Sequence, residues 1–337
     1  MRRPEFWDNS PGMLSALLAP GAVLWTAAGR LRRTLTTPAR AGVRVVCVGN
    51  LTVGGSGKTP VALALARRLA DRNPMFLTRG HGGRLPGPLA VDLTRHTARD
   101  VGDEPLLLAR VAPTIVARDR RAGAALAARL GAGLIVMDDG LQNPGLAKDL
   151  SLVVIDGEAG FGNGQVMPAG PLREPAGDGL ARADAVVRVG EDRHGLAATL
   201  GLHLPVLAAT IVPAPAADAV ARRRVVAFAG IGRPEKFFAT LRAMRCEIVA
   251  SHAYPDHHVF APEEIMRAVE EAAAKDAVAV TTEKDWVRLP DEAQPMVTPV
   301  PVTLRWADDA ALDRVLAPLI RASSPPPVRD RGASRTS

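Results

Sequence analysis

The chain has 337 residues, of which 47% are hydrophobic, 23% are charged and 4% are aromatic. This composition supports packed cores and excludes a collagen-like, coiled-coil or wholly disordered chain. Lysine and arginine (42) outnumber aspartate and glutamate (35), and the formal net charge of +7 favours anionic ligands. Aromatic residues for base stacking are few, so we expect no nucleic-acid partner. Two cysteines, Cys47 and Cys246, are too few for a disulfide framework and fit a reducing compartment.

The first predicted element is an apolar segment near the N-terminus. Residues 13–29 carry no charge, and arginines follow at positions 30, 32 and 33. The segment is shorter than the roughly 20 apolar residues of a spanning helix and contains Pro20, so a helix in the membrane interface is the better interpretation. A core helix would show the same pattern, and a signal peptide fits less well because acidic residues interrupt its basic start. The residues alone therefore leave the interfacial helix and the core helix both open.

Between residues 34 and 212, apolar runs alternate with helical patterns, the order that builds a parallel sheet through right-handed crossovers. The helical patterns lie at residues 62–69 and 119–130. Strands are predicted at Val43–Val48, Met75–Thr78, Thr114–Ala117, Leu134–Met137, Leu152–Ile155 and Val206–Val212.

A break in composition at residues 213–218 indicates a linker, after which the alternation restarts. Residues 213–322 are predicted to form a smaller α/β domain, and the polar, Pro-rich residues 323–337 a disordered tail. The predicted strands of the smaller domain are Val225–Ala229, Cys246–Ala250, Val278–Thr281 and Val300–Leu304, and its predicted helices are Glu235–Met244, Pro262–Ala274 and Asp309–Ile320.

A glycine-rich loop follows the first predicted strand and opens the first predicted helix. Residues 49–60 read G-N-L-T-V-G-G-S-G-K-T-P, close to the Walker A pattern except for Thr52 at the first glycine position. Backbone N–H groups of such a loop bind phosphate oxygens, Lys58 reaches the β and γ phosphates, and Thr59 can ligate Mg²⁺. The predicted nucleotide-binding residues are Thr52, Val53, Gly54, Gly55, Ser56, Gly57, Lys58 and Thr59.

Two carboxylates follow the apolar run Leu134–Met137. Asp138 and Asp139 then stand at the carboxyl end of a buried strand, where either can face Thr59 and a metal ion directly or through water. Alone, Asp-Asp-Gly also fits an ordinary turn. Together with the phosphate loop, the pair predicts an Mg²⁺ site that serves a nucleotide, with the first domain a P-loop NTPase-like α/β fold.

Seven segments, in order along the chain, resemble the tetraacyldisaccharide 4'-kinases of lipid A synthesis. The resemblance implies two α/β/α lobes joined by a hinge, with largely parallel sheets. It also implies transfer of the ATP γ-phosphate to the 4'-hydroxyl of a tetraacylated glucosamine disaccharide 1-phosphate, giving lipid IVA, at the cytoplasmic face of the inner membrane. Because such a substrate lies in the bilayer, the resemblance favours residues 1–33 as a membrane-contacting segment. We expect the protein to be a monomer. The segments are Val48–Pro60, Thr78–Gly82, Gly102–Pro105, Asp138–Gln142, Pro168–Glu174, Tyr254–His258 and Thr281–Asp285.

The resemblance also implies roles for individual side chains. Asp103 accepts or orients the proton of the sugar hydroxyl, and His257 orients Asp103 or shares that proton. Arg79 and Arg173 are candidate clamps for phosphate oxygens, and Glu174 supports the metal or holds Arg173. From the residues alone, the favoured interpretation of Asp103 is an acidic helix start in which Glu104 is the cap and Pro105 the first helical residue.

The family pattern leaves some positions open. His81 and Leu141 stand where the family often has aromatic residues. The wall of the site that these two side chains form can therefore differ from that of other family members. Residues 282–285 follow a strand of the second lobe, so they face the same crevice as the other motifs. No role is assigned to them. Only five basic residues are lysines, so a lysine in a motif is easy to notice; they stand at positions 58, 148, 236, 275 and 284.

Other functions share parts of this pattern. A P-loop ATPase of the partitioning type also has a glycine-rich Lys-Thr loop and binds DNA through a basic surface, but it needs neither Asp103 nor His257. A GTPase is disfavoured because no Asn-Lys-x-Asp sequence occurs. A kinase for a different small molecule, on the same scaffold, is the third alternative.

Overall fold

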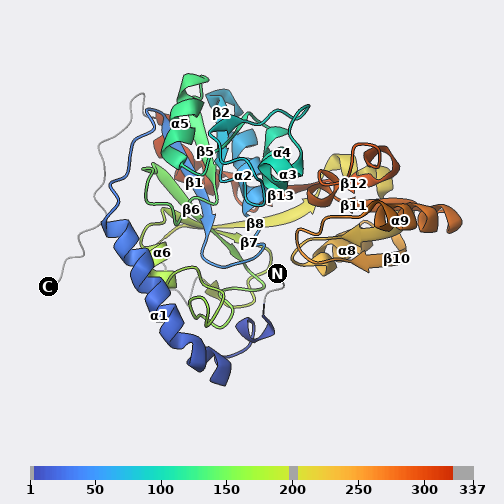
Figure 1. The fold of residues 1–337 in the computed structure, drawn as a ribbon, viewed down its shortest axis with the longest axis horizontal. Helices are drawn as coiled ribbons and strands as arrows, with labels where there is room; N and C mark the ends of the chain where they lie inside the picture. Colours follow the sequence, from blue (N-terminus) through green and yellow to red (C-terminus); the bar gives the residue numbers. More distant parts are fainter. Residues whose placement is uncertain (1–3, 197–203, 322–337) are drawn as a thin grey trace.

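The alternating pattern produces two sheets, each covered by helices on both faces, in the computed structural model of the chain. The structure describes residues 4–196 and 204–321, so the predicted tail at 323–337 lies outside the described residues. The large lobe and the small lobe lie side by side (Figure 1). The predicted α/β class with two α/β/α layers is confirmed.

The large lobe is built on a sheet with strand order β13-β8-β7-β6-β1-β5-β2-β4-β3. The strands from β8 to β4 pair in parallel, and the two edge strands β13 and β3 are antiparallel. Of the central strands, the sequence analysis missed only β7. The bounds are β1 Arg44–Asn50, β2 Pro74–Thr78, β3 Leu89–Ala90, β4 Thr114–Val116, β5 Leu134–Asp138, β6 Leu150–Asp156, β7 Ala185–Val189, β8 Val206–Pro213 and β13 Val302–Trp306.

Helices cover both faces of this sheet. On one face, apolar side chains of α2 and α11 share a core cluster with the strands, and on the other face those of α5 and α6 do. β1 is buried along its whole length, as expected for a central strand. The helices of this lobe are α2 Lys58–Arg68, η2 Ala70–Arg72, α3 Ala98–Val101, α4 Asp103–Ala109, α5 Arg120–Arg129, α6 Ala176–Leu180 and α11 Asp309–Arg321.

The small lobe contains an all-parallel sheet with strand order β10-β9-β11-β12. Residues of η3 and α8 pack on one of its faces and residues of α9 on the other. Its elements are η3 Pro215–Val220, β9 Arg224–Ala229, α8 Pro234–Ala243, β10 Glu247–Ala253, α9 Pro262–Ala274, β11 Val278–Thr282, α10 Glu283–Trp286, η4 Gln294–Met296 and β12 Thr298–Val300.

The chain returns to the large lobe earlier than predicted. The expected single strand Val300–Leu304 is wrong: β12 ends at Val300 in the small sheet, and β13 begins at Val302 in the large one. Pro301 lies between them, has no N–H for a ladder, and accepts a hydrogen bond from Ala214 N at 3.0 Å. The segment 302–321, expected in the small domain, therefore belongs to the large lobe.

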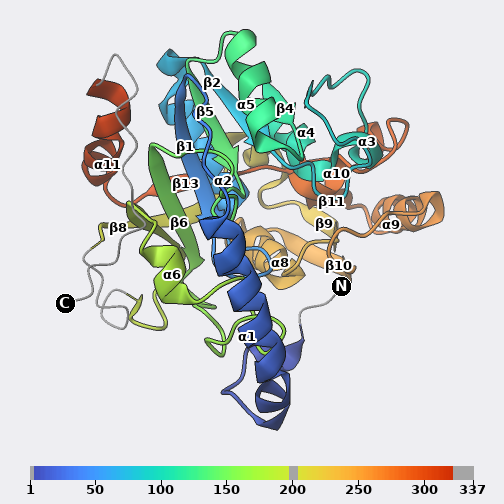
Figure 2. The ribbon, with the colours of Figure 1, turned by 60° about the vertical axis from the view of Figure 1, so that its left-hand side comes forward.

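Helix α1 (Met13–Thr34) follows the short helix η1 (Glu5–Trp7) and runs along the large lobe. Its N-terminal half projects beyond the sheet (Figure 1 and Figure 2). The helix continues through Pro20 and through the arginines that follow the apolar segment, and it is long enough and apolar enough to cross a membrane. Large apolar side chains are exposed along it, including Met13 (89%) and Leu17 (75%). The alternative of a core helix is therefore wrong.

Candidate active site

The glycine-rich loop connects β1 to α2, which is the context the motif requires. Gly57 caps α2 with φ of 84°, and a Cβ atom there would also lie 3.3 Å from Val189. Both facts favour glycine at this position. The Nζ of Lys58 lies 3.1 Å from Oδ1 of Asn50 and 3.6 Å from Oδ1 of Asp139. The lysine is thus held at the start of the helix by groups from two neighbouring strand ends.

Thr52 replaces the first glycine of the Walker pattern without strain. It forms an antiparallel bridge with Leu172, and Val53 N donates a hydrogen bond to the carbonyl of Pro171 at 2.8 Å. Bridge pairing requires an extended backbone, which any residue adopts. The segment that ends in Arg173 therefore lies beside the loop and positions its first half.

The two adjacent aspartates after β5 have different environments. Asp138 is fully buried, and neither of its carboxylate oxygens has a hydrogen-bond partner among the described residues. Burial, together with the charge of Glu104, raises the pKa of Asp138 to about 7. Asp139 is only partly buried. Burial disfavours its charged form too, but Lys58 and Arg173 outweigh this effect and hold the pKa of Asp139 below the usual range. Its Oδ1 lies 2.7 Å from Nη1 of Arg173.

The donors at this position fit Mg²⁺ bound together with a nucleotide. Among the described residues, no group of three or more His, Cys, Asp or Glu side chains could hold a metal ion. Mg²⁺ is commonly held by one or two carboxylates, with phosphate oxygens and water completing its shell. The unpartnered buried carboxylate of Asp138 suits that kind of site, and Thr59 in the first turn of α2 can add a hydroxyl oxygen.

Glu174 has partners other than those expected. Its buried carboxylate accepts hydrogen bonds from Arg33 of α1, Arg182 and Gln142, at 3.0, 2.7 and 3.0 Å. The neighbouring carbonyl of Arg173 accepts from Nε1 of Trp25 at 2.8 Å. Glu174 therefore does not hold the Arg173 side chain; it connects helix α1 to the segment that carries this arginine.

The predicted clamp Arg79 has an exposed side chain after β2. A different arginine is buried beside the acidic pair: Arg120, at the start of α5, is 4% exposed, and its Nε has no hydrogen-bond partner within the described part of the chain. Burial lowers the pKa of Arg120 to about 10, although the negative charges of Asp139 and Asp138 act to raise it. The sequence analysis missed Arg120 because it lies in no motif and follows an ordinary helix cap.

Asp103 and His257 come together from the two lobes. Asp103 is the first residue of α4, and Gly102 is the N-cap, so the expected cap at Glu104 is wrong. The Asp103 side chain is 4% exposed, and its Oδ2 lies 3.0 Å from Nδ1 of His257. The ring is not aligned for a regular hydrogen bond, so this buried oxygen retains acceptor capacity. Gly102 is required here, with φ of 94° and a would-be Cβ 2.4 Å from the carbonyl of His81.

The charges around Asp103 keep it ionised. Burial opposes ionisation, but His257, Lys284 and Arg288 outweigh it and lower the pKa of Asp103 to about 2. Nζ of Lys284 lies 3.2 Å from Nε2 of His257 and 3.9 Å from Oδ2 of Asp103. A buried, ionised carboxylate with a free lone pair is suited to accept a proton from a hydroxyl group.

The Asp103 and His257 pair lies near the phosphate loop. A Cβ atom at Gly232 would lie 3.4 Å from Oδ2 of Asp256 and 4.0 Å from the backbone nitrogen of Gly55. Asp256 directly precedes His257, so the small-lobe loop approaches the tip of the phosphate loop. Glu104, next to Asp103, also acts electrostatically on Asp138. The two predicted halves of the site therefore share one junction between the lobes.

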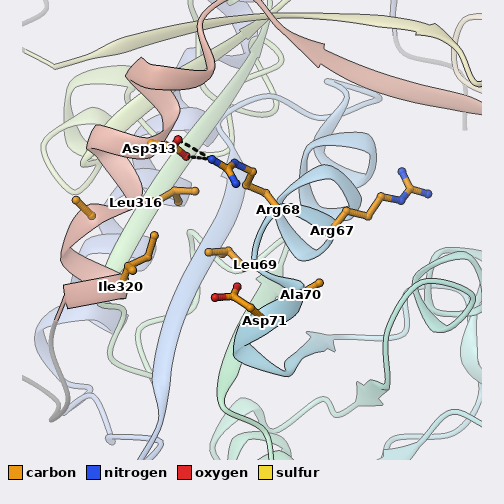
Figure 3. Close-up of a pocket in the computed structure, with 9 residues that line it drawn as sticks. Arg67, Arg68, Leu69, Ala70, Asp71, Asp313, Leu316 and Ile320 are labelled. Atoms are coloured by element: carbon orange, nitrogen blue, oxygen red, sulfur yellow. Dashed lines mark hydrogen bonds and ion pairs between the residues drawn. The ribbon is translucent and has the colours of Figure 1, made fainter.

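A second ionic contact crosses the same junction. Asp156, at the end of β6, pairs with Arg233 at 2.9 Å and with Lys236 at 3.0 Å. A pocket between α2 and α11 lies elsewhere (Figure 3). It is lined by Arg67, Arg68 and Asp313, so it lies at the opposite end of α2 from Lys58 and outside this site.

The sequence analysis left two contributing side chains without a role. Asn50 lies within the loop motif and holds Lys58. Lys284 lies in the motif 281–285, and the scarcity of lysine could have drawn attention to it. Lys284, Asp103 and His257 come from three separate parts of the chain. Only the fold therefore shows that they meet.

The chain is similar to known proteins over nearly its whole length. The family model described as Tetraacyldisaccharide-1-P 4'-kinase matches residues 14–321. A tetraacyldisaccharide 4'-kinase of Rhodospirillum centenum is 57% identical over 95% of this chain and 97% of its own. One of Paramagnetospirillum magneticum is 53% identical over 91% of this chain and 95% of its own.

A solved structure has a similar fold. The crystal structure of the "apo" form of LpxK from Aquifex aeolicus in complex with ATP has a TM-score of 0.73 and 26% sequence identity. The similarity covers 91% of this chain and 99% of that one. Both lobes are therefore included in the match.

Proposed function

This chain belongs to the tetraacyldisaccharide-1-P 4'-kinase family, and from that premise and the geometry of the site we propose that it phosphorylates an acylated disaccharide. The γ-phosphate of ATP passes to the 4'-hydroxyl of a tetraacylated glucosamine disaccharide 1-phosphate, and the product is lipid IVA. A sugar hydroxyl is a weak nucleophile at neutral pH, so the enzyme needs a positioned proton acceptor beside the nucleotide.

The observation that carries this proposal is the pairing of Asp103 with His257 across the lobes. Oδ2 of Asp103 lies 3.0 Å from Nδ1 of His257, and the pair lies next to the phosphate loop. A P-loop ATPase without an acceptor substrate has no use for such a pair. Asp103 is the side chain that receives the hydroxyl proton on its free Oδ2 lone pair. His257 orients the carboxylate and balances its charge.

The nucleotide side follows from the loop geometry. Residues 52–59 surround the phosphates, Lys58 contacts the β and γ phosphates, and Arg173 stabilises the phosphoryl oxygens in the transition state. Asp138 and Thr59 would hold Mg²⁺, which neutralises charge on the transferred group when bound. Asp139 holds Lys58 and Arg173 in position, since its carboxylate lies 3.6 and 2.7 Å from them.

The membrane side follows from α1. Its exposed apolar side chains lie in the bilayer interface, and Arg32, exposed near its C-terminal end, remains near the headgroups. An acylated substrate can then present its sugar to the site while its chains stay in the membrane. We place the enzyme at the cytoplasmic face of the inner membrane, where ATP is available. One chain supplies every residue of the site, so we expect an active monomer.

Incubation of the purified protein with γ-labelled ATP, Mg²⁺ and the acylated disaccharide in detergent tests the proposal. The expected result is label in the lipid product, lost when Lys58 is replaced by Met and retained when Lys275, in an ion pair with Glu271, is replaced by Met. Label released only as free phosphate would instead support the ATPase alternative and contradict the kinase proposal.

A further inference from the structure

The motif Thr281–Asp285 has no place in the mechanism above, although it stands at the carboxyl end of β11. Most of its residues have structural partners. Thr281 Oγ1 donates to the carbonyl of Phe228 at 2.7 Å, and Thr282 caps α10 by accepting from Asp285 N. Asp285 is buried and accepts from Gly230 N at 3.1 Å. Lys284 differs, because its side chain leaves the small-lobe core and reaches the large lobe.

Lys284 contacts groups from both lobes. Its Nζ lies 3.2 Å from Nε2 of His257 and 3.8 Å from Oδ1 of Asp256, both in the small lobe. It lies 3.9 Å from Asp103 and 3.8 Å from Glu104, both in the large lobe. The side chain is 24% exposed, so this cation is largely withdrawn from solvent.

The contact with His257 restricts the protonation of the ring. A lysine ammonium group has three donors and no acceptor, so Nε2 can receive its hydrogen bond only through a lone pair. On the other side of the ring, Nδ1 faces the carboxylate of Asp103 at 3.0 Å and must carry hydrogen to interact favourably. Asp256, which could accept from a protonated Nε2, is farther from it, at 3.8 Å.

We propose that Lys284 is a positioning residue that holds His257 in the neutral form with hydrogen on Nδ1. This inference rests on the proposed function of Asp103 as proton acceptor. A neutral His257 with hydrogen on Nδ1 cannot take the hydroxyl proton at the nitrogen nearest the carboxylate. Asp103, which reaches the ring from the large lobe, is then the proton acceptor.

The surrounding charges make a cation necessary at this position. The groups that face the pair are Glu104 beside Asp103, Asp256 beside His257, Arg288 at 3.9 Å from Asp103, and the ring of His81 at 6.0 Å from that of His257. Two of these carboxylates, those of Asp103 and Asp256, lie 3.0 and 3.8 Å from ring nitrogens of His257. Arg288 is directed to Asp285 and Gly230, so Lys284 is the cation that contacts Nε2.

Histidine ring nitrogens that carry hydrogen can be distinguished by NMR in protein labelled with ¹⁵N-histidine. The spectra are recorded on the full chain in detergent without substrate, and His257→Gln assigns the signal. We expect hydrogen on Nδ1 and none on Nε2 in the wild-type protein and in Lys284→Arg. In Lys284→Met we expect Nε2 to gain hydrogen at the same pH. Lys275→Met is the matched control and should match the wild-type spectrum.

A wild-type Nε2 that already carries hydrogen, or a Lys284→Met spectrum identical to that of the wild type, would overturn the inference. Because no turnover is needed, this result is separate from the kinase assay. A wild-type protein that fails to label the lipid would disprove the proposed function and leave the NMR result for Lys284 standing.

Kinetics give a second readout. Lys284→Met should lower kcat by about 10²-fold, the scale of a misplaced catalytic group, with the KM for ATP unchanged. Removal of the cation disfavours the Asp103 carboxylate and raises its pKa, so the acid limb of the pH–rate profile should move to higher pH. Lys284→Arg should restore both. Equal loss in the Met and Arg variants with an unmoved acid limb would indicate a merely structural role.

Discussion

The nucleotide side and the proton-accepting side of the site are built differently. Residues 50–59 form one continuous loop within the large lobe, between β1 and α2, and their geometry depends on local backbone conformation. Asp103 and His257 instead come from different lobes, and Lys284 joins them from a third segment. The first side therefore consists of residues from the large lobe alone. The second exists only where the lobes meet.

The largest effect is expected on the nucleotide side. Replacing Lys58 by Met removes the cation that reaches the phosphates and leaves Asp139 with Arg173 as its nearest cation. We expect kcat/KM for ATP to fall by about 10³-fold, as for loss of a preorganised transition-state donor. Steady-state kinetics at saturating lipid measure this. A loss below tenfold would show that the loop does not bind the triphosphate.

An intermediate effect is expected where the lipid enters. Leu17 and Leu24 are exposed on α1, and replacing both by Gln removes apolar area from the membrane-facing side. Burying one leucine is worth about 1.5–3 kcal/mol, so the KM for lipid should rise at least about tenfold. The KM for ATP should stay constant, because neither side chain touches the Arg33 and Trp25 contacts to residues 173–174. Vesicle flotation provides the parallel binding measurement, and unchanged flotation would argue against membrane contact by α1.

The smallest effect is expected at the other ionic contact between the lobes. Lys236 is 45% exposed and pairs with Asp156 and Glu158, both at 3.0 Å. Exposed ion pairs contribute about 0–1 kcal/mol to stability. Lys236→Gln should therefore lower the free energy of unfolding by less than about 1 kcal/mol and leave kcat unchanged. Urea denaturation and the transfer assay measure the two quantities. A large fall in kcat would mean that this contact also assembles the site.

The same contrast explains what the sequence could predict. The phosphate loop and the acidic pair are short motifs with fixed spacing at strand ends, so their position in the fold follows from the chain itself. The pattern around Pro301 did not show that the run spanning residues 300–304 divides between two sheets, because alternation does not specify which sheet a strand joins. The sequence equally could not show that Arg120 lies beside the acidic pair or that Lys284 lies beside His257. The partners of these two side chains depend on how helices and lobes pack, which local sequence spacing does not predict.

Helix α1 shows another limit of sequence reasoning. The apolar segment was recognised, but the sequence did not show that Arg30 and Arg33, which follow it on the same helix, pair with Asp178 and Glu174. Those carboxylates lie far away in sequence. The predicted roles of Glu174, at the metal or at Arg173, therefore did not include its partner Arg33 on helix α1.

A double-mutant cycle on Asp103→Asn and His257→Gln tests the central claim most directly. Each single variant should lower kcat, with Asp103→Asn the more severe at about 10³-fold, and the KM for ATP should remain constant. Because the two side chains form one proton-accepting unit across the lobes, the double variant should be no slower than Asp103→Asn alone. A double variant whose loss equals the product of the two single losses would show that Asp103 and His257 act independently.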